Sequence, residues 1–249
     1  MKLDFSQISY AALSDIGHRR ELNEDAVLAI PDMGVFMVCD GLGGAKGGAE
    51  ASRSVVDCVA AEFEKTTMES ARHVHAFRLL MVNRGIGAAN QRILKFSGEQ
   101  GFKGMGSTVT ALVFSERAEK RVYFLHAGDS PAFRLRGNQM DRLIKDHSVE
   151  RALGYHADHL PASIRLALTS AVGLDPKFKL EPTLTDWEPG DVFLLCTDGL
   201  TKMLPMMDIG EFLMEGIGHP PEWTAKRLVR EANEAGGYDN VSVVLLYVT

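Results

Sequence analysis

VFMVCDGLGG, residues 35–44, and VFLLCTDGL, residues 192–200, are two apolar runs that both end in Asp-Gly-Leu. Each run predicts a strand that ends in a turn, because Asp bonds its own backbone and Gly accepts a positive φ. Ordinary turns would explain either stretch taken alone. The residues placed beside the two aspartates therefore decide whether the repetition has a chemical meaning.

The residues before the first stretch predict a hairpin. AVLAI (26–30) runs out, PDMG (31–34) turns, and VFMVC (35–39) runs back. If Ile30 pairs with Val35, Asp25 lies opposite Asp40. Two like charges in that position are destabilising unless positive charge lies near them.

The second stretch repeats this placement, with Asp198 at the end of one strand and Asp239, in GGYDNVSVV, at the start of the last. In an antiparallel sheet, such ends share an edge, so the acids converge. A group of aspartates without His or Cys suits Mg²⁺ or Mn²⁺ and does not suit zinc. The glycine after each Asp lets a backbone carbonyl approach such an ion.

Arg19 and Arg20 precede Asp25, and a guanidinium binds phosphate in a two-bond fork. The glycine-rich stretch GLGGAKGGAEAS (41–52) matches neither a Walker loop nor G-x-G-x-x-G. We interpret it as a turn from Asp40 into a helix that starts near Gly48. The residues alone thus predict a bimetal site beside a phosphate clamp.

Composition limits the number of domains and the classes of partner that this chain can have. The 249 residues are 45% hydrophobic, which suits one globular domain over residues 1–249. The net charge of −6 argues against nucleic acid as a partner. Neither a membrane span nor a signal peptide is apparent, which predicts a soluble, cytoplasmic protein without a membrane partner. The three cysteines are widely spaced and suit small buried side chains.

The apolar pattern predicts an α+β fold in layers. Strands are expected at 26–30, 35–39, 108–114, 121–127, 131–136, 192–196 and 241–248. Helices are expected around 52–63, over about 70–96, and at 222–235 with Trp223, Leu228, Val229 and Ala232 inward. Residues 145–185 are weakly patterned and are interpreted as a mobile flap. We interpret the following histidines as structural or surface groups: His73, His75, His156 and His159.

The ordered set of motifs resembles the metal-dependent protein phosphatases of the 2C type, including the bacterial Ser/Thr phosphatases. The matching segments are SDIGHRRELNEDA, VFMVCDGLGG, KGMGSTVTALV, HAGDSPAFRLR, LTSAVG, VFLLCTDGL and GGYDNVSVVLL. The resemblance implies a four-layer αββα sandwich of two antiparallel sheets flanked by helices. It also implies two Mn²⁺ or Mg²⁺ ions and a third, weaker one.

Residue by residue, the resemblance makes Arg20 the phosphate-binding arginine and Asp40 the carboxylate that bridges two metals. It implies a carbonyl ligand at Gly41 and makes Asp198 and Asp239 further ligands and catalytic residues. The third metal is implied at Asp129 with Asp198, and Glu24 and Asp25 resemble outer-shell groups. Three departures from the family pattern are Leu42 in place of a frequent histidine, Pro131 in place of Arg, and Lys202 in place of an acid.

The implied activity is hydrolysis of phosphoserine and phosphothreonine in proteins by a metal-bridging hydroxide. The implied protein is a monomeric enzyme that opposes a Ser/Thr kinase and acts on its phosphorylated substrates. Two alternatives remain open. An aspartyl-phosphate phosphatase would use Asp40 as the nucleophile, and a catalytically silent module of the same fold would only bind phosphoproteins.

Overall fold

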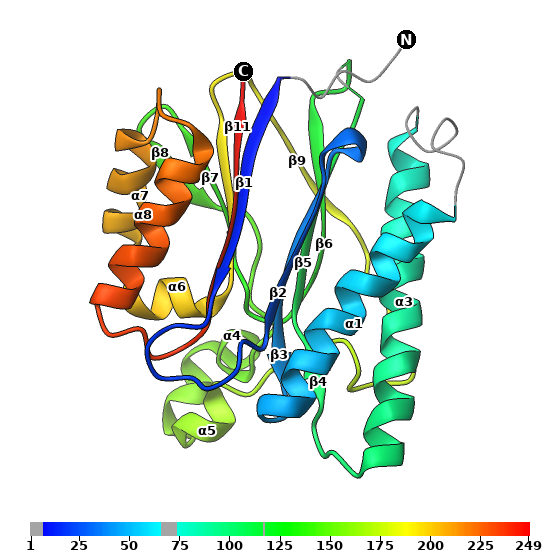
Figure 1. Ribbon diagram of the computed structural model, residues 1–249. Helices are drawn as coiled ribbons and strands as arrows, with labels where there is room; N and C mark the ends of the chain where they lie inside the picture. Colours follow the sequence, from blue (N-terminus) through cyan, green and yellow to red (C-terminus); the bar gives the residue numbers. More distant parts are fainter. Residues whose placement is uncertain (1–6, 66–73, 117) are drawn as a thin grey trace.

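The computed structural model describes residues 7–65, 74–116 and 118–249. Two antiparallel sheets pack face to face, and helices cover both outer faces (Figure 1). The predicted four-layer αββα sandwich is confirmed. No helix in the described ranges is long and apolar enough to cross a bilayer.

One sheet contains the predicted hairpin and is covered by two long helices. Its strands, in spatial order, are β2 (Asp25–Ile30), β3 (Val35–Leu42), β5 (Val109–Phe114), β6 (Arg121–Ala127) and β9 (Thr183–Asp186), and the short β4 (Gly106–Ser107) pairs with β3. The covering helices are α1 (Ala45–Glu64) and α3 (His75–Gln100), on the right in Figure 1.

The other sheet joins the two ends of the chain. Its strands, in spatial order, are β1 (Ile8–Asp15), β11 (Val241–Val248), β10 (Val192–Cys196), β7 (Ala132–Arg136) and β8 (Gln139–Arg142). Three helices follow β10 along the chain, α6 (Asp198–Met203), α7 (Met206–Glu215) and α8 (Pro221–Glu234). The part of the chain that connects β8 to β9 contains α4 (Val149–Leu153), the 3-10 turn η2 (Gly154–His159) and α5 (Ala162–Arg165).

Strand alternation explains why VFMVC is apolar throughout. Met37 and Cys39 pack into the layer below α1 and α3, whereas Phe36 and Val38 pack between the two sheets. Successive side chains of a strand point to opposite faces, and both faces of β3 are buried. A third apolar layer lies between the other sheet and its helices.

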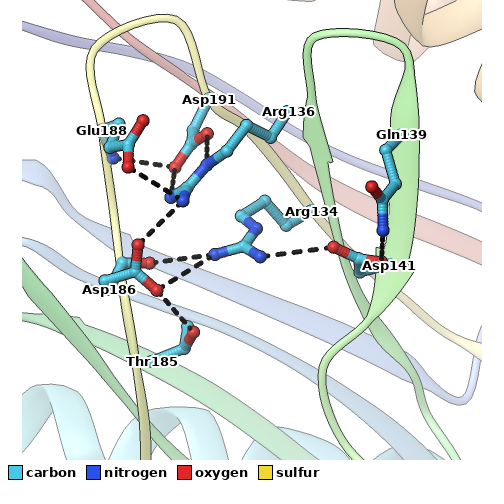
Figure 2. Close-up of polar contacts among 8 residues, drawn as sticks. All are labelled: Arg134, Arg136, Gln139, Asp141, Thr185, Asp186, Glu188 and Asp191. Carbon is cyan, nitrogen blue, oxygen red and sulfur yellow. Dashed lines mark hydrogen bonds and ion pairs between the residues drawn. The ribbon is translucent and has the colours of Figure 1, made fainter.

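A network of ion pairs ties the two sheets together (Figure 2). Arg136 of β7 donates two hydrogen bonds of 2.7 Å to Asp191, which is 1% exposed. Its remaining nitrogen bonds Asp186 of β9 at 2.8 Å. Arg134 contacts Asp186 and Asp141 of β8. Because β7 and β9 belong to different sheets, this network fixes one sheet against the other.

The structure confirms the expected strands and corrects several details. The sequence analysis missed β1, β8, β9, α6 and α7. Helix α1 begins at Ala45 rather than near Gly48. Trp223, expected inward on α8, is 42% exposed and stacks on His219. Residues 70–73 of the second expected helix lie outside the described residues, and the mobile flap at 145–185 stays a prediction.

Candidate functional site

The first pair of carboxylates lies where the hairpin register predicts. Asp25 of β2 is the direct partner of Asp40 of β3. The connection is the short 3-10 turn Pro31–Met33, and Gly34 follows it with a φ of 60°. Such a φ favours glycine, and so short a turn leaves the strands one register.

Asp40 is held from both sides by Thr108. The Asp40 amide donates to Thr108 Oγ1 at 2.9 Å, and the Thr108 amide donates to the Asp40 carbonyl at 2.8 Å. Thr108 Oγ1 also bonds Ser130 Oγ at 2.7 Å. Since Ser130 follows Asp129 directly in the chain, these bonds connect the segments that carry Asp40 and Asp129.

The second pair of carboxylates comes from the other sheet. Asp198 is the first residue of α6, and Asp239 lies just before β11. The turn expected at Asp198 is therefore wrong, since the chain enters a helix directly after β10. Lys202 Nζ lies 2.6 Å from Asp198 Oδ2 and 3.5 Å from Asp239 Oδ2. One ammonium group thus contacts both carboxylates, so the predicted convergence of these two acids is present.

Asn240 organises the loop around this pair, and the sequence analysis did not identify it. Its side chain accepts a hydrogen bond from the Glu24 amide at 2.8 Å and donates to the carbonyls of Ile16 and Leu22. Asn240 is 3% exposed. The only feature of the sequence that pointed to a role for Asn240 was its position between Asp239 and the last predicted strand. It fastens the loop between β1 and β2 to β11.

Both glycines that follow the aspartates are required by close backbone packing. A Cβ at Gly41 would lie 2.1 Å from the Gly48 carbonyl oxygen. A Cβ at Gly199 would lie 2.0 Å from the Asn240 carbonyl oxygen. Packing alone thus gives both positions a reason for glycine, beside the expected approach of a carbonyl to a metal.

Burial first, and then the neighbouring negative charges, raise the pKa values of Asp25, Asp40 and Asp129. Burial raises the pKa of Asp25 to about 7, and the charges of Asp198 and Asp239 add to the effect. The pKa of Asp40 lies well above its ordinary value, first through burial and then through the Asp25 charge. Burial and the Asp198 charge raise the pKa of Asp129 to about 6. The cluster is short of positive charge.

Arg20 supplies part of that charge. Its guanidinium lies 2.8 Å from Asp239 and 3.3 Å from Glu24, and 43% of its side chain is exposed. Arg19 lies elsewhere, with its guanidinium 5.6 Å from the centroid of the Tyr238 ring. Of the two neighbouring arginines, Arg20 thus contacts the acids of the site, and Arg19 contacts an aromatic ring.

The donors around the cluster suit a hard divalent cation. Within the described part of the chain, Asp198 Oδ1 and Glu24 Oε1 are buried without a hydrogen-bond partner. Carboxylate oxygens with open lone pairs and mutual repulsion are the ligands that Mg²⁺ and Mn²⁺ prefer. The residues present therefore fit the metals that the sequence analysis expects.

A tighter group of ligand atoms lies elsewhere, at the start of α3. His75, Glu116 and Glu119 are the only described His, Cys, Asp or Glu residues that form a group of three with ligand atoms within 4.8 Å of one another. His75 Nδ1 lies 2.5 Å from Glu116 Oε2, and its ring stacks on Tyr123 with centroids 4.9 Å apart. These contacts agree with a structural His75, while His73 lies outside the described residues.

Comparison with known proteins identifies the family. The family model described as protein phosphatase 2C matches residues 17–228. The chain belongs to the protein phosphatase 2C family. Protein phosphatase PhpP of Streptococcus pneumoniae is 26% identical over 94% of this chain and 95% of its own length.

Two solved structures share the fold. PppA, a regulatory component of the T6SS in Pseudomonas aeruginosa, is 28% identical with a TM-score of 0.84, covering 97% of this chain and 98% of its own. The catalytic domain of the serine threonine protein phosphatase PstP, solved with two manganese ions, is 29% identical with a TM-score of 0.80 and the same coverage. The present chain is a protein-serine/threonine phosphatase.

Proposed function

We propose that this 2C-type phosphatase hydrolyses phosphoserine and phosphothreonine in proteins at the carboxylate cluster, with divalent cations as cofactors. The observation that carries the proposal is the convergence of buried acids from both sheets. Asp25 lies opposite Asp40, and Asp198 and Asp239 share the Lys202 ammonium. Burial raises the pKa values of Asp25, Asp40 and Asp198, and acids in such a position need cations to stay ionised together.

Four residues are the proposed ligands of two Mn²⁺ or Mg²⁺ ions: Asp40, the Gly41 carbonyl, Asp198 and Asp239. Asp129 with Asp198 would hold a third ion, and Glu24 and Asp25 would bond waters around the cluster. Bound cations would acidify water and offset the negative charge of the phosphoryl oxygens. The manganese ions of PstP support this choice of metal.

Arg20 is proposed to bind the phosphate. Its guanidinium already lies at the cluster, in contact with Asp239, and its exposed part faces solvent. A guanidinium offers two parallel N–H bonds to a phosphoryl group, which orients the phosphorus toward the carboxylate cluster. The side chain of Leu42 can donate no proton, so the leaving hydroxyl takes its proton from water or another residue.

The proposed partners are phosphorylated proteins and the Ser/Thr kinase that modifies them, which the phosphatase would oppose as a cytoplasmic monomer. The competing idea of a silent binding module predicts the loss of metal ligands. All four proposed ligand positions of the two-metal site keep their expected residues. Catalysis is therefore favoured over mere recognition.

Phosphate release from a phosphothreonine peptide tests the proposal. Release is expected with added Mn²⁺ or Mg²⁺ and is expected to stop with a chelator. Asp239→Asn is expected to abolish it while the protein stays folded, whereas the exposed Asp57→Asn on α1 serves as the matched control. Full turnover in metal-free buffer, or in the Asp239→Asn variant, would refute the proposed site.

A further inference from the structure

One pocket is lined by none of the acids of the carboxylate cluster. It has a volume of about 400 Å³ and opens between β6, the chain that follows β8, and the chain that leads into β9. Its lining includes Phe124, His126, Ile144, His147, Glu181 and Thr183. Two imidazoles thus share one cavity with a carboxylate.

Hydrogen bonds determine which nitrogen of His126 carries the proton. The hydroxyl of Thr110 has one hydrogen, and it donates this hydrogen to the Ser130 carbonyl at 2.6 Å. Thr110 Oγ1 also lies 2.9 Å from His126 Nδ1, so it must accept there. The Val109 carbonyl, 3.2 Å from the same nitrogen, is an acceptor too. These two acceptors favour the proton on Nδ1, which leaves a lone pair on Nε2 of the neutral ring.

That lone pair has no partner within the described part of the chain. His126 Nε2 and His147 Nδ1 are both buried nitrogens without a hydrogen bond there, and His126 is only 9% exposed. Burial lowers the pKa of His126 to about 4 and also lowers the pKa of His147. Both rings are thus neutral near pH 7, the form in which imidazole binds metals.

The spacing of the two rings suits one shared ion. Their centroids lie 4.8 Å apart with planes inclined by 40°. Two imidazoles on a tetrahedral zinc ion, with Zn–N bonds of about 2.0 to 2.1 Å, have centroids about 5 Å apart. We propose that His126 and His147 form a transition-metal site of the zinc type, with water as the further ligands.

The proposed site differs from the carboxylate cluster in the ion that it would select and in the elements that the ion would join. Imidazole selects zinc-like ions, whereas carboxylates select Mg²⁺ and Mn²⁺. The His147 amide donates to the Gly128 carbonyl at 2.7 Å, and the Thr169 amide donates to the His147 carbonyl at 2.8 Å. An ion on both rings would therefore fasten β6 to the chain around α4 and α5.

Calorimetric titration of Zn²⁺ into the full chain tests the proposal, with saturating Mg²⁺ present to occupy the carboxylates. His126→Asn keeps an amide donor in the place of Nδ1 and removes Nε2, and His147→Gln removes Nδ1. Each is expected to weaken Zn²⁺ binding by more than the roughly 10- to 100-fold that the loss of an outer-shell partner costs. The exposed His219→Asn and the cluster variant Asp239→Asn are expected to leave this binding unchanged.

Histidine ¹⁵N spectra of the unaltered chain give a readout that does not depend on the folding of any variant. Zn²⁺ is expected to shift His126 Nε2 and His147 Nδ1 and to leave His219 in place. The proposal is overturned if Zn²⁺ causes no such shifts in the presence of saturating Mg²⁺. It is also overturned if both pocket variants keep the Zn²⁺ affinity of the unaltered chain. Because Asp239→Asn tests the carboxylate cluster separately, failure of one site is distinguishable from failure of the other.

Discussion

Lys202 is expected to compete with divalent cations for their carboxylates. Its ammonium lies on Asp198 and Asp239, two of the proposed metal ligands. A cation that binds these oxygens must displace the ammonium or tolerate its repulsion. Replacing Lys202 by Gln removes the charge while keeping a polar side chain, so metal affinity is expected to rise.

The distances give the size of this effect. Lys202 Nζ lies 2.6 Å from Asp198 and 3.5 Å from Asp239, and 53% of its side chain is exposed. Exposed ion pairs contribute about 0.2–1 kcal/mol, because solvent screens them. Asp198 is only 16% exposed, which favours the upper part of that range. Two contacts of about 0.5–1 kcal/mol each correspond to a rise in Mn²⁺ affinity of about 5- to 30-fold.

Calorimetric titration of Mn²⁺ measures the change directly and does not depend on turnover. Lys202→Arg keeps the charge and is expected to bind Mn²⁺ about as weakly as the unaltered chain. Lys226→Gln, on the exposed face of α8, controls for the loss of one positive charge. Equal or weaker Mn²⁺ affinity in Lys202→Gln would show that the ammonium does not compete with the metal.

Three further predictions address the phosphate clamp, the helix packing and the buried histidine. Arg20→Ala is expected to raise KM for a phosphopeptide, with a total loss in kcat/KM of about 1.5–3 kcal/mol, and steady-state kinetics would contradict the assignment if Arg19→Ala gave that loss instead. Gly85→Ala on α3 places a Cβ 2.5 Å from the backbone of α1 and is expected to destabilise the fold by about 1–3 kcal/mol. Gly87→Ala on the same helix meets open space and is expected to stabilise by about 0.5–1 kcal/mol, so equal urea midpoints for the two would refute the packing argument. His126 has a folded pKa of about 4 against 6.5 in a free chain, so the folded state binds fewer protons between these values and stability falls as pH drops through that window. Between pH 7 and pH 4.5, the free energy of unfolding is expected to fall by about 2–3 kcal/mol less in His126→Asn than in the unaltered chain. Urea unfolding at both pH values measures this difference. An equal fall in both proteins would show that the ring is not buried and neutral.

The β2–β3 hairpin was predictable because everything that decides it is local. The apolar runs, the four-residue turn and the glycine at its end lie within sixteen residues of sequence, and they leave one register that places Asp25 opposite Asp40. The long apolar strands were predictable for a related reason. A strand segment buried on both faces, such as Val35 to Cys39 of β3, is apolar at every position and stands out from its surroundings.

The three strands that the sequence analysis missed, β1, β8 and β9, lie at the edges of their sheets. Strand β1 has a mixed burial pattern and pairs with β11, at the other end of the chain. The short β8 and β9 contain no buried residue. Trp223 follows the helical apolar pattern but lies at the exposed edge of α8. Periodicity indicates which residues share a face, but only packing decides how much of that face is covered.

The candidate site, too, has features that the sequence could predict and features that only the tertiary structure decided. Sequence alone could determine the types of residue, the acids at strand ends and the arginine beside them, since these follow from motif and register. Only the tertiary structure could bring Lys202 onto Asp198 and Asp239, or make Asn240 the group that fastens Glu24 to β11. Those contacts join residues that only the packing of the two sheets brings together. A side chain's partner across such a distance depends on the whole fold, because no local rule of turn or strand geometry specifies it.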